Sequence, residues 1–318
     1  MTDGDLKQDG HSLKDTVAKR YFGQREVFAD LCNAFLFRQP GRLDASRLRP
    51  MPTEYNELIL NADGKYESHK RERDLAFQAF TDGDRGYALL CAEFQSTSDS
   101  TMPVRIMLYD GLDYAYQLKN RLCSEAGRVL PISTMVVNIG GQEWRGPKSL
   151  HEMFPERDDF VEANVPDYPI KVFDPRTEDV KILDSLCTDL KSVSYLFRFS
   201  DRGDLLSEKY QDDSTSYLGG YGIDLVNVCL NMGLVAPEEG RRLEMCKAVE
   251  DLKAIGRDEG RDEGIQIGIG KGRTEGIETV AANALKKGMP PNVVEEITGL
   301  PPLRILQIAQ EIRLGAIR

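Results

Sequence analysis

A run over residues 87–94 that is apolar except for Glu93 is the clearest strand signal in the chain. It follows a turn signal at 82–84 and has the length and composition of a buried strand. A less regular alternation over 75–80 indicates a preceding strand, and the tight turn between the two predicts an antiparallel hairpin. Such pairing would bring Asp74, just before the first strand, beside Glu93, near the end of the second.

Helical spacing of apolar residues predicts helices on both sides of this hairpin. The predicted helices run from Ser12, a suitable N-cap, to Phe37 with a break at Gly23, and then over 102–118, 183–199 and 216–234. Further apolar runs predict a first hairpin over 58–74 and strands at 132–139 and 168–173. These elements predict an α/β fold in which helices flank a mixed sheet, followed by a helical C-terminal region.

The C-terminal region begins with a short repeat. Glycine recurs every four residues, at positions 256, 260, 264, 268, 272 and 276. On a helix these glycines would form a stripe that permits close contact with a partner, although each costs roughly 1 kcal/mol in helix propensity. The pattern therefore favours a self-association helix or a jointed linker. It does not favour a phosphate loop, because no strand precedes it and the Walker spacing is absent.

Three short helices are predicted after the repeat, over 278–288, 291–299 and 302–314. Such a bundle is either a DNA-binding helix-turn-helix or a module that binds a partner or a second copy. Glu295 and Glu296 lie in its middle helix, where acidic side chains oppose phosphate contact. The sequence therefore favours a homo-oligomer formed through the C-terminal region.

The patterns divide the chain into five predicted parts. These are a disordered N-terminus (1–11), a core (12–175), a helical extension (176–250), the glycine-repeat linker or helix (251–280) and a small helical module (281–318).

The acidity of the chain is unevenly distributed. The net charge is −11, with −1 over residues 1–150, −10 over 151–250 and zero over the remainder. The overall acidity therefore does not exclude nucleic-acid binding by the first part. Arginines gather there at positions 38, 42, 47 and 49, either as a phosphate-facing cluster or as a solvated loop.

Cysteine and histidine usage narrows the chemistry. The six cysteines show no CxxC spacing and mostly lie in apolar contexts, which predicts reduced core residues of a cytoplasmic protein. The three histidines lie in separate segments, so a histidine-based zinc site is not expected. We expect no membrane contact, because no apolar stretch approaches the length of a bilayer span and the first residues do not form a signal peptide.

The acidic residues of the hairpin are the main candidates for chemistry. Side chains alternate along a strand, so Glu93 and Gln95 share one face while Phe94 points to the other. Carboxylate oxygens are ligands for Mg²⁺ or Mn²⁺. Acids beside turns are often simply solvated, but a carboxylate that ends a run as apolar as YALLCA must be paired or coordinated.

The order of these residues resembles a known group of enzymes. An early acid, Asp74 at a hairpin and a Glu-x-Gln sequence at 93–95 together resemble the PD-(D/E)XK nuclease superfamily, with Gln95 where lysine is commoner. More narrowly, the chain resembles the recombination-promoting nuclease (Rpn, YhgA-like) family, whose members are also described as transposases. Segments 15–37, 102–118 and 129–154 match that family in order, and so does the glycine-punctuated tail.

The chain also departs from the family pattern at two positions. Arg73 stands where proline usually precedes the aspartate, and Asn138 stands where the third strand usually has tyrosine. Only the acid is chemically required at the first position, so the departures bear more on packing than on metal binding.

The resemblance implies a restriction-endonuclease-like core and Mg²⁺-dependent cleavage of DNA, linked to recombination or mobile elements. By resemblance, Asp74, Glu93 and the backbone carbonyl of Phe94 would hold Mg²⁺ or Mn²⁺, and Gln95 would orient the attacking water. The alternatives are a catalytically inactive interaction protein with a nuclease fold and a transposase-related DNA-binding protein. Strand transfer by a full transposase would need a separate acidic triad, which the sequence does not contain.

Two further residues are expected near the site. Asp15, on the first predicted helix, would complete the metal shell, with Asp30 as second choice; alternatively, Asp15 only favours the first helical turn through the helix dipole. Arg105, one turn before Tyr109 on the next helix, either reaches the scissile phosphate or binds an acid or a helix end.

Overall fold

The computed structural model describes residues 3–60, 66–120, 128–211, 213, 215–238 and 242–314, and leaves aside the side chains of residues 3–12 and 55–71. The chain divides into two compact units, Met1–Leu252 and Lys253–Arg318.

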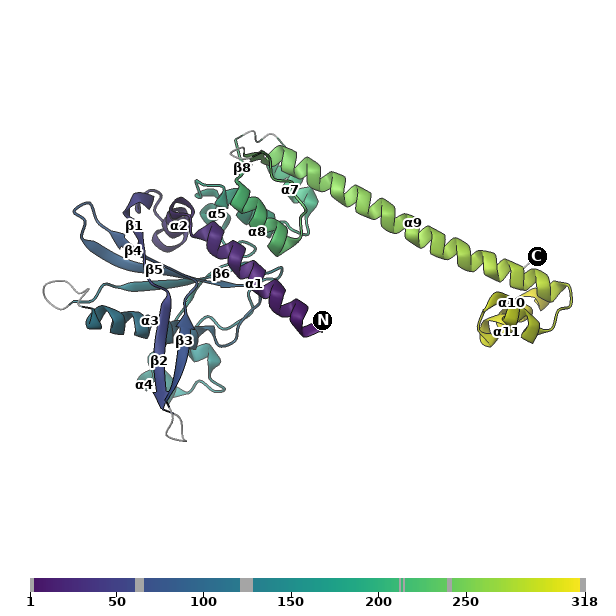
Figure 1. Cartoon of the computed structure of the whole chain (residues 1–318), viewed down its shortest axis with the longest axis horizontal. Helices are drawn as coiled ribbons and strands as arrows, with labels where there is room; N and C mark the ends of the chain where they lie inside the picture. Colours follow the sequence, from purple (N-terminus) through teal and green to yellow (C-terminus); the bar gives the residue numbers. More distant parts are fainter. Residues whose placement is uncertain are drawn as a thin grey trace. The chain divides into compact units, whose positions relative to one another are not determined.

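A mixed five-stranded sheet forms the centre of the first unit (Figure 1). Its strands are, in spatial order, β1 (Leu48–Pro50), β4 (Leu75–Phe80), β5 (Gly86–Gln95), β6 (Ile132–Asn138) and β7 (Lys171–Phe173). β1, β4 and β5 are antiparallel neighbours, whereas β5, β6 and β7 run parallel. The predicted α/β fold and the β4–β5 hairpin are confirmed.

Two small sheets accompany the central one. β2 (Glu54–Leu60) and β3 (Tyr66–Glu72) form the predicted first hairpin, and β8 (Tyr217–Leu218) pairs with β9 (Leu243–Glu244). After β3 the backbone amide of Arg73 donates to the carbonyl of Thr53 at 2.9 Å. The chain then enters β4 directly, which fixes the start of the central hairpin.

Helices cover both faces of the central sheet. α3 (Met102–Lys119) makes the crossover between the parallel strands β5 and β6, as parallel pairing requires. It packs over one face with Val136, Trp144 and Ile170, so the only tryptophan is a core residue. α1 (Asp3–Phe22), α2 (Arg25–Leu31) and the π-helix η1 (Cys32–Phe37) contribute to a larger core on the other face.

The remaining elements of the first unit are short. They are η2 (Ala45–Arg47), η3 (His151–Met153), α4 (Asp159–Asn164), α5 (Val180–Asp184), α6 (Leu190–Arg198), α7 (Gly203–Tyr210) and α8 (Gly220–Leu230). The apolar side chains of α5 to α8 belong to the same core as those of α1 and α2. These helices therefore belong to the same compact unit as the central sheet.

Several element boundaries differ from the prediction. α1 begins at Asp3 and not at Ser12, because extending a helix that has already nucleated adds one hydrogen bond for each residue fixed. The predicted helix over 183–199 is two helices, and α7 was not predicted at all. Asp30 accounts for the interruption, since its carboxylate accepts hydrogen bonds from the backbone amides of Cys187 and Thr188 at 2.7–3.0 Å.

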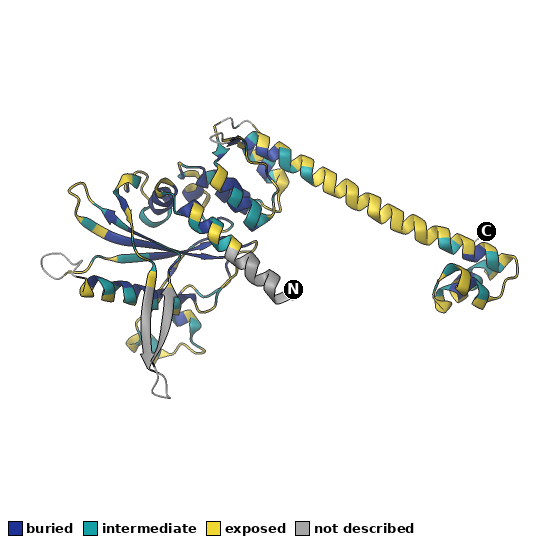
Figure 2. Cartoon of the chain, viewed as in Figure 1, coloured by how far each residue is buried: buried dark blue, intermediate teal, exposed yellow. Residues whose placement is uncertain are grey.

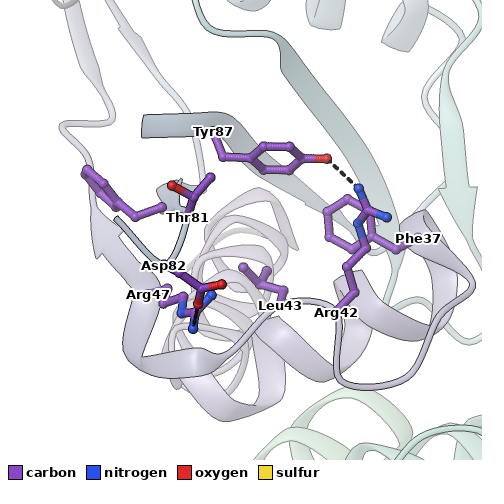
Figure 3. A pocket seen from close by; sticks show the side chains of 8 residues that line it. Phe37, Arg42, Leu43, Arg47, Thr81, Asp82 and Tyr87 are labelled. Carbon is purple, nitrogen blue, oxygen red and sulfur yellow. Dashed lines mark hydrogen bonds and ion pairs between the residues drawn. The ribbon is translucent and has the colours of Figure 1, made fainter. Parts of the chain in front are cut away.

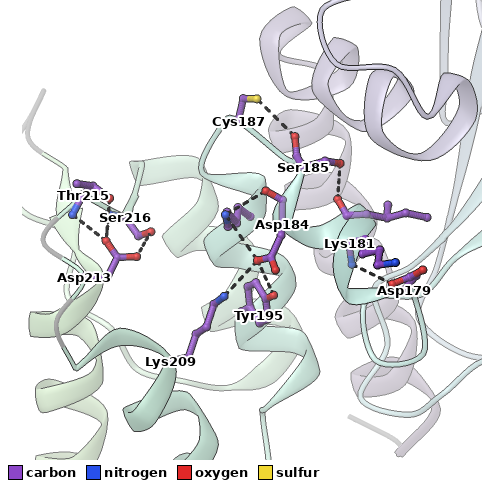
Figure 4. Close-up of polar contacts among 12 residues, drawn as sticks. Asp179, Lys181, Asp184, Ser185, Cys187, Tyr195, Lys209, Asp213, Thr215 and Ser216 are labelled. Atoms are coloured by element: carbon purple, nitrogen blue, oxygen red, sulfur yellow. Dashed lines mark hydrogen bonds and ion pairs between the residues drawn. The ribbon is translucent and has the colours of Figure 1, made fainter.

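Polar contacts hold these short helices together (Figure 4). The carboxylate of Asp184 accepts a hydrogen bond from the Tyr195 hydroxyl at 2.8 Å and pairs with the Lys209 amine at 3.1 Å. Asp213 accepts from the backbone amides of Thr215 and Ser216. Asp184 and Asp213 therefore each have donors of their own within this acidic part of the chain.

The second unit is helical. α9 (Met245–Lys286) continues into it and is followed by α10 (Pro291–Thr298) and α11 (Pro302–Arg313), whose shared core contains Ala281, Val294 and Ile305. The glycine repeat is part of α9, which confirms the helix reading of that segment. A Cβ built at any of the six repeat glycines meets nothing within 4 Å among the described residues, and most of α9 is exposed (Figure 2). No described helix is long and apolar enough to span a membrane.

Candidate functional site

The candidate site lies where β4 begins and β5 ends. Leu75 pairs with Ala92, and one further step of the same register places Asp74 opposite Glu93. Directly opposed residues of an antiparallel pair project from the same face. Asp74 Oδ2 accepts a hydrogen bond from the backbone amide of Phe94 at 2.7 Å. The structure therefore brings Asp74, Glu93 and the backbone of Phe94 together, as the sequence predicted.

Glu93 is the most unusual residue of the site. Its side chain is 0% exposed, and neither carboxylate oxygen has a hydrogen-bond partner among the described residues. Burial and, to a smaller extent, the charge of Asp74 raise the pKa of Glu93 to about 8, although Arg73, Arg105 and the nearby Asp74 amide act in the opposite direction. At neutral pH Glu93 is therefore mostly protonated unless a cation joins it.

Asp74 has partners on both of its oxygens. While Oδ2 binds the Phe94 amide, Oδ1 lies 3.1 Å from the amine of Lys19 on α1. Burial still raises the pKa of Asp74, because the desolvation of the carboxylate outweighs the contributions of Phe94 and Lys19. The Asp74 side chain is 15% exposed, so this carboxylate borders solvent while Glu93 lies behind it.

Asp15 approaches the site through Lys19. The Lys19 amine lies 3.0 Å from Asp15 Oδ2, so one amine bridges Asp15 and Asp74. Burial lowers the pKa of Lys19, but hydrogen bonds and charge from Asp15 and Asp74 outweigh burial and raise it, so the amine stays protonated. Asp30, the second choice from the sequence, is not at the site, because its carboxylate caps the segment at Cys187 and Thr188.

Arg105 reaches the site from the other side. It lies in the first turn of α3, where its Nη1 pairs with Asp99 at 2.7 Å and its Nη2 lies 3.7 Å from Glu93 Oε2. Its side chain remains 35% exposed. Arg105 is thus bound to an acid, as one reading of the sequence held, and it also lies beside Glu93.

Gln95 and the loops after β5 and β6 close the end of the sheet. The Gln95 side chain shares the face of Glu93 and is largely buried, and its backbone carbonyl accepts from Ile139 at 2.9 Å. A Cβ at Gly140 would overlap the carbonyl oxygen of Ser96. The backbones of the two loops are therefore in direct contact, and only glycine fits at position 140. Asn138 donates to the Gln142 carbonyl at 2.8 Å and to Asp174 at 2.9 Å, which explains a polar residue at this departure from the family pattern.

Arg73 is a buried charge that sequence reasoning did not assign. Its side chain is completely buried, with Nη2 donating to Asp110 at 2.5 Å, Nη1 donating to Thr134 at 2.8 Å and Nε lying 2.9 Å from Asp113. Asp110 also accepts from the Tyr168 hydroxyl. The sequence did contain a signal for a buried cation. Asp110 and Asp113 lie three residues apart on the otherwise apolar face of the predicted helix over 102–118, and buried acids need a partner.

The arginine cluster lies at the opposite end of β5, where Arg42 and Arg47 line a pocket of about 220 Å³ (Figure 3). Arg42 donates to the Tyr87 hydroxyl at 3.0 Å and stacks over the Phe37 ring at 5.1 Å. Arg47 pairs with Asp82, and Arg49 pairs with Asp84 at 2.6 Å. Two of the four arginines therefore neutralise acids of the β4–β5 turn, and a phosphate-facing role for this cluster stays a prediction.

The donor set fits a hard divalent cation. Within the described residues no three His, Cys, Asp or Glu side chains gather into a preformed metal site. The two buried oxygens of Glu93 and the carboxylate of Asp74 nevertheless form an oxygen-only donor set. Mg²⁺ commonly binds through one or two carboxylates and keeps several waters, so a small protein donor set is sufficient.

Comparison with known proteins adds one finding. Residues 15–191 match the protein family described as "Putative transposase, YhgA-like". The match covers the central sheet and every candidate residue described above. No curated protein and no solved structure matches the chain.

Proposed function

The chain belongs to the family of YhgA-like putative transposases, and from this membership together with the geometry of the site we propose that it is a metal-dependent DNA endonuclease. It hydrolyses phosphodiester bonds with Mg²⁺ or Mn²⁺ and acts in DNA recombination or on mobile elements, with DNA as its partner.

One observation carries the proposal. Glu93 is a carboxylate at the end of an apolar strand, fully buried, without a hydrogen-bond partner among the described residues, and beside a second carboxylate. An unpaired buried carboxylate destabilises the folded state, so its presence needs a reason. A bound cation between Glu93 and Asp74 would relieve both desolvation and mutual repulsion.

The residues of the site have distinct roles in this proposal. Asp74, Glu93 and the Phe94 carbonyl would hold the ion, which when bound supplies an activated water and positive charge at the scissile phosphate. Gln95 is uncharged, so its amide can orient the water without adding charge. Arg105 keeps an exposed guanidinium beside Glu93 and is placed to bind a phosphate oxygen.

A supercoiled-plasmid assay tests the function. We expect the purified protein to nick or linearise plasmid with Mg²⁺ or Mn²⁺ and not with EDTA. Asp74→Asn and Glu93→Gln keep the shape of each side chain, and each should reduce the rate by at least about 10³-fold, since a metal ligand acts on the transition state. Full cleavage by Asp74→Asn would refute the assignment. Products that join two DNA molecules would indicate strand transfer instead.

A second candidate is a catalytically inactive protein that retains the nuclease fold for binding. Lys19 favours it, because its amine pairs with both Asp74 and Asp15 and offsets their charge. Calorimetry separates the two functions. Heat from Mn²⁺ binding that disappears in Glu93→Gln supports the enzyme, whereas a protein that binds no Mn²⁺ at millimolar concentration fits the inactive reading.

The C-terminal region supports a further part of the proposal, which is that the chain forms homo-oligomers through α9. Isolated helices gain little stability from propensity, and the repeat glycines lower it further. Ile265, Ile267 and Ile269 are also half exposed or more. We expect light scattering to give a dimer or larger assembly, and Gly264→Glu together with Gly268→Glu to weaken it. A monomer at all concentrations would contradict this.

A further inference from the structure

We propose that Lys19 is a further catalytic residue of this site, which binds the scissile phosphate through its amine. The inference rests on the proposed endonuclease function and adds a residue to it. It starts from the position of the Lys19 amine, which lies 3.0 Å from Asp15, 3.1 Å from Asp74 and 3.7 Å from Glu72.

The packing of α1 fixes this position. Ala18, next to Lys19, is completely buried, and the ring of Phe22, one turn later, stacks on the ring of Phe94 with centroids 5.1 Å apart. Phe94 follows Glu93 in β5, so α1 is anchored on the strand that carries the candidate metal ligand. The packing of α1 on β5 therefore fixes the position of Lys19 relative to Glu93.

The charge balance of the site requires such a cation. Asp15, Glu72, Asp74 and Glu93 contribute four carboxylates, and a phosphodiester adds another negative charge. Gln95 contributes no charge, and the Arg105 guanidinium is shared between Asp99 and Glu93. Among the described residues, the cationic side chain that forms an ion pair with Asp74 is Lys19. The Lys19 side chain is 29% exposed, so a phosphate can reach the amine without a rearrangement of the core.

Lys19 acts through hydrogen bonding and charge. Two carboxylates aim the amine, and one of its three N–H groups donates to a non-bridging oxygen of the phosphate as negative charge develops there. The water oxygen forms the new bond to phosphorus and gives its proton to solvent, while the ester P–O bond breaks and the leaving alkoxide takes a proton from solvent. Lys19 keeps all its protons throughout.

Substitutions on α1 test the role. Lys19→Met removes the charge and keeps the length, Lys19→Arg keeps the charge, and Lys14→Met is the matched control on the same helix. For each protein we would measure the cleavage rate at saturating Mn²⁺ and the Mn²⁺ affinity by calorimetry. We expect Lys19→Met to cleave at least 100-fold more slowly while binding Mn²⁺ as tightly as wild type or more so, because a competing positive charge has been removed. Lys19→Arg should recover part of the rate, and Lys14→Met should stay within twofold of wild type.

Other outcomes would overturn the inference. Cleavage by Lys19→Met within threefold of wild type would exclude a catalytic role. Joint loss of Mn²⁺ binding and cleavage in a folded Lys19→Met, checked by circular dichroism, would show that Lys19 only holds the acids in place. If Lys19→Met does not fold, Lys19→Arg becomes the test. A Lys19→Arg protein that cleaves at less than 1% of the wild-type rate would then contradict the proposed role of Lys19. A wild-type protein that binds and cleaves nothing would instead refute the proposed function, and this role with it.

Discussion

Arg73 and Glu93 are both completely buried ionisable side chains near the same strand pair, and they differ in the partners that surround them. Arg73 contacts Asp110, Asp113 and Thr134 at 2.5–2.9 Å. Glu93 has no hydrogen-bond partner among the described residues, and the Arg105 guanidinium lies 3.7 Å from it. The fold thus surrounds the Arg73 guanidinium with two carboxylates and a hydroxyl and leaves the Glu93 carboxyl without a hydrogen bond among the described residues, only twenty residues away in the chain.

Under the proposed function, Arg73 serves the structure and Glu93 serves the bound ion. Breaking a buried ion pair costs several kcal/mol, so the Arg73 cluster ties the start of β4 to α3 and β6. A buried carboxyl without a hydrogen-bond partner, such as that of Glu93, reduces the stability of the fold. Binding of a cation to the folded state would offset this loss of stability.

The largest expected effect concerns Arg73. Arg73→Met would leave Asp110 and Asp113 buried without their cation, and we expect the free energy of unfolding to fall by about 3–5 kcal/mol. Urea denaturation at neutral pH measures this. Arg105→Gln is the control, because its partly exposed pairs should contribute less than about 1 kcal/mol. A loss below 1 kcal/mol in Arg73→Met would mean that the buried cluster contributes little.

The second prediction concerns the pH dependence caused by Glu93. Its pKa is about 8 in the folded protein and 4.5 ordinarily, so the folded state binds the proton more tightly. The stability that this provides is fully present below about pH 4.5 and is lost as the pH rises through about 8. Without metal, Glu93→Gln should therefore gain roughly 2–4 kcal/mol relative to wild type between pH 5 and pH 9. Parallel stability curves for the two proteins would show that Glu93 does not titrate in this range.

The third prediction is the stabilisation of the folded protein by metal. At 100 times its Kd, Mn²⁺ should raise the free energy of unfolding by about 2.7 kcal/mol, because it binds the folded state alone. Thermal unfolding with and without Mn²⁺ at pH 8 measures the shift, and Glu93→Gln should abolish it. An equal shift in the variant would place the ion elsewhere.

The smallest expected effect concerns Arg105. The charge of Arg105 lowers the pKa of Glu93, so Arg105→Gln should move the midpoint of the Glu93 titration to higher pH. Because the Arg105 side chain is 35% exposed, solvent screens the interaction and a shift of a fraction of a pH unit is expected. Comparing the stability curves of Arg105→Gln and wild type over pH 5–9 detects it. A midpoint that moves to lower pH would contradict the sign.

The sequence contained enough information for the hairpin and its acids, because the signals there are local. An apolar strand that ends in Glu93, a turn at 82–84 and period-two alternation determine the pairing and the shared face of Asp74 and Glu93. α3 and β6 were likewise predicted from apolar spacing that their packing confirms. The roles of the site residues in metal binding and catalysis stay predictions.

The contacts that the sequence did not predict are all long-range. Asp30 binds a segment 157 residues away, and Arg73 pairs with acids almost forty residues later. The position before Asp74 was interpreted only as a tolerated departure from proline, so the buried cation went unnoticed. The contact between Lys19 and Asp74 is not predicted for the same reason, since helical spacing on α1 does not show which strand residue its amine meets.

The close approach of Gly140 to Ser96 limits how the protein can vary. Every amino-acid replacement at position 140 adds at least one carbon atom, and even the smallest would collide with a main-chain oxygen that cannot rotate away. Random mutagenesis screened for cleavage should therefore recover this codon almost unchanged, although the residue carries no reactive group. Libraries intended to alter the preference of the site should hold position 140 constant and diversify exposed positions such as Arg145.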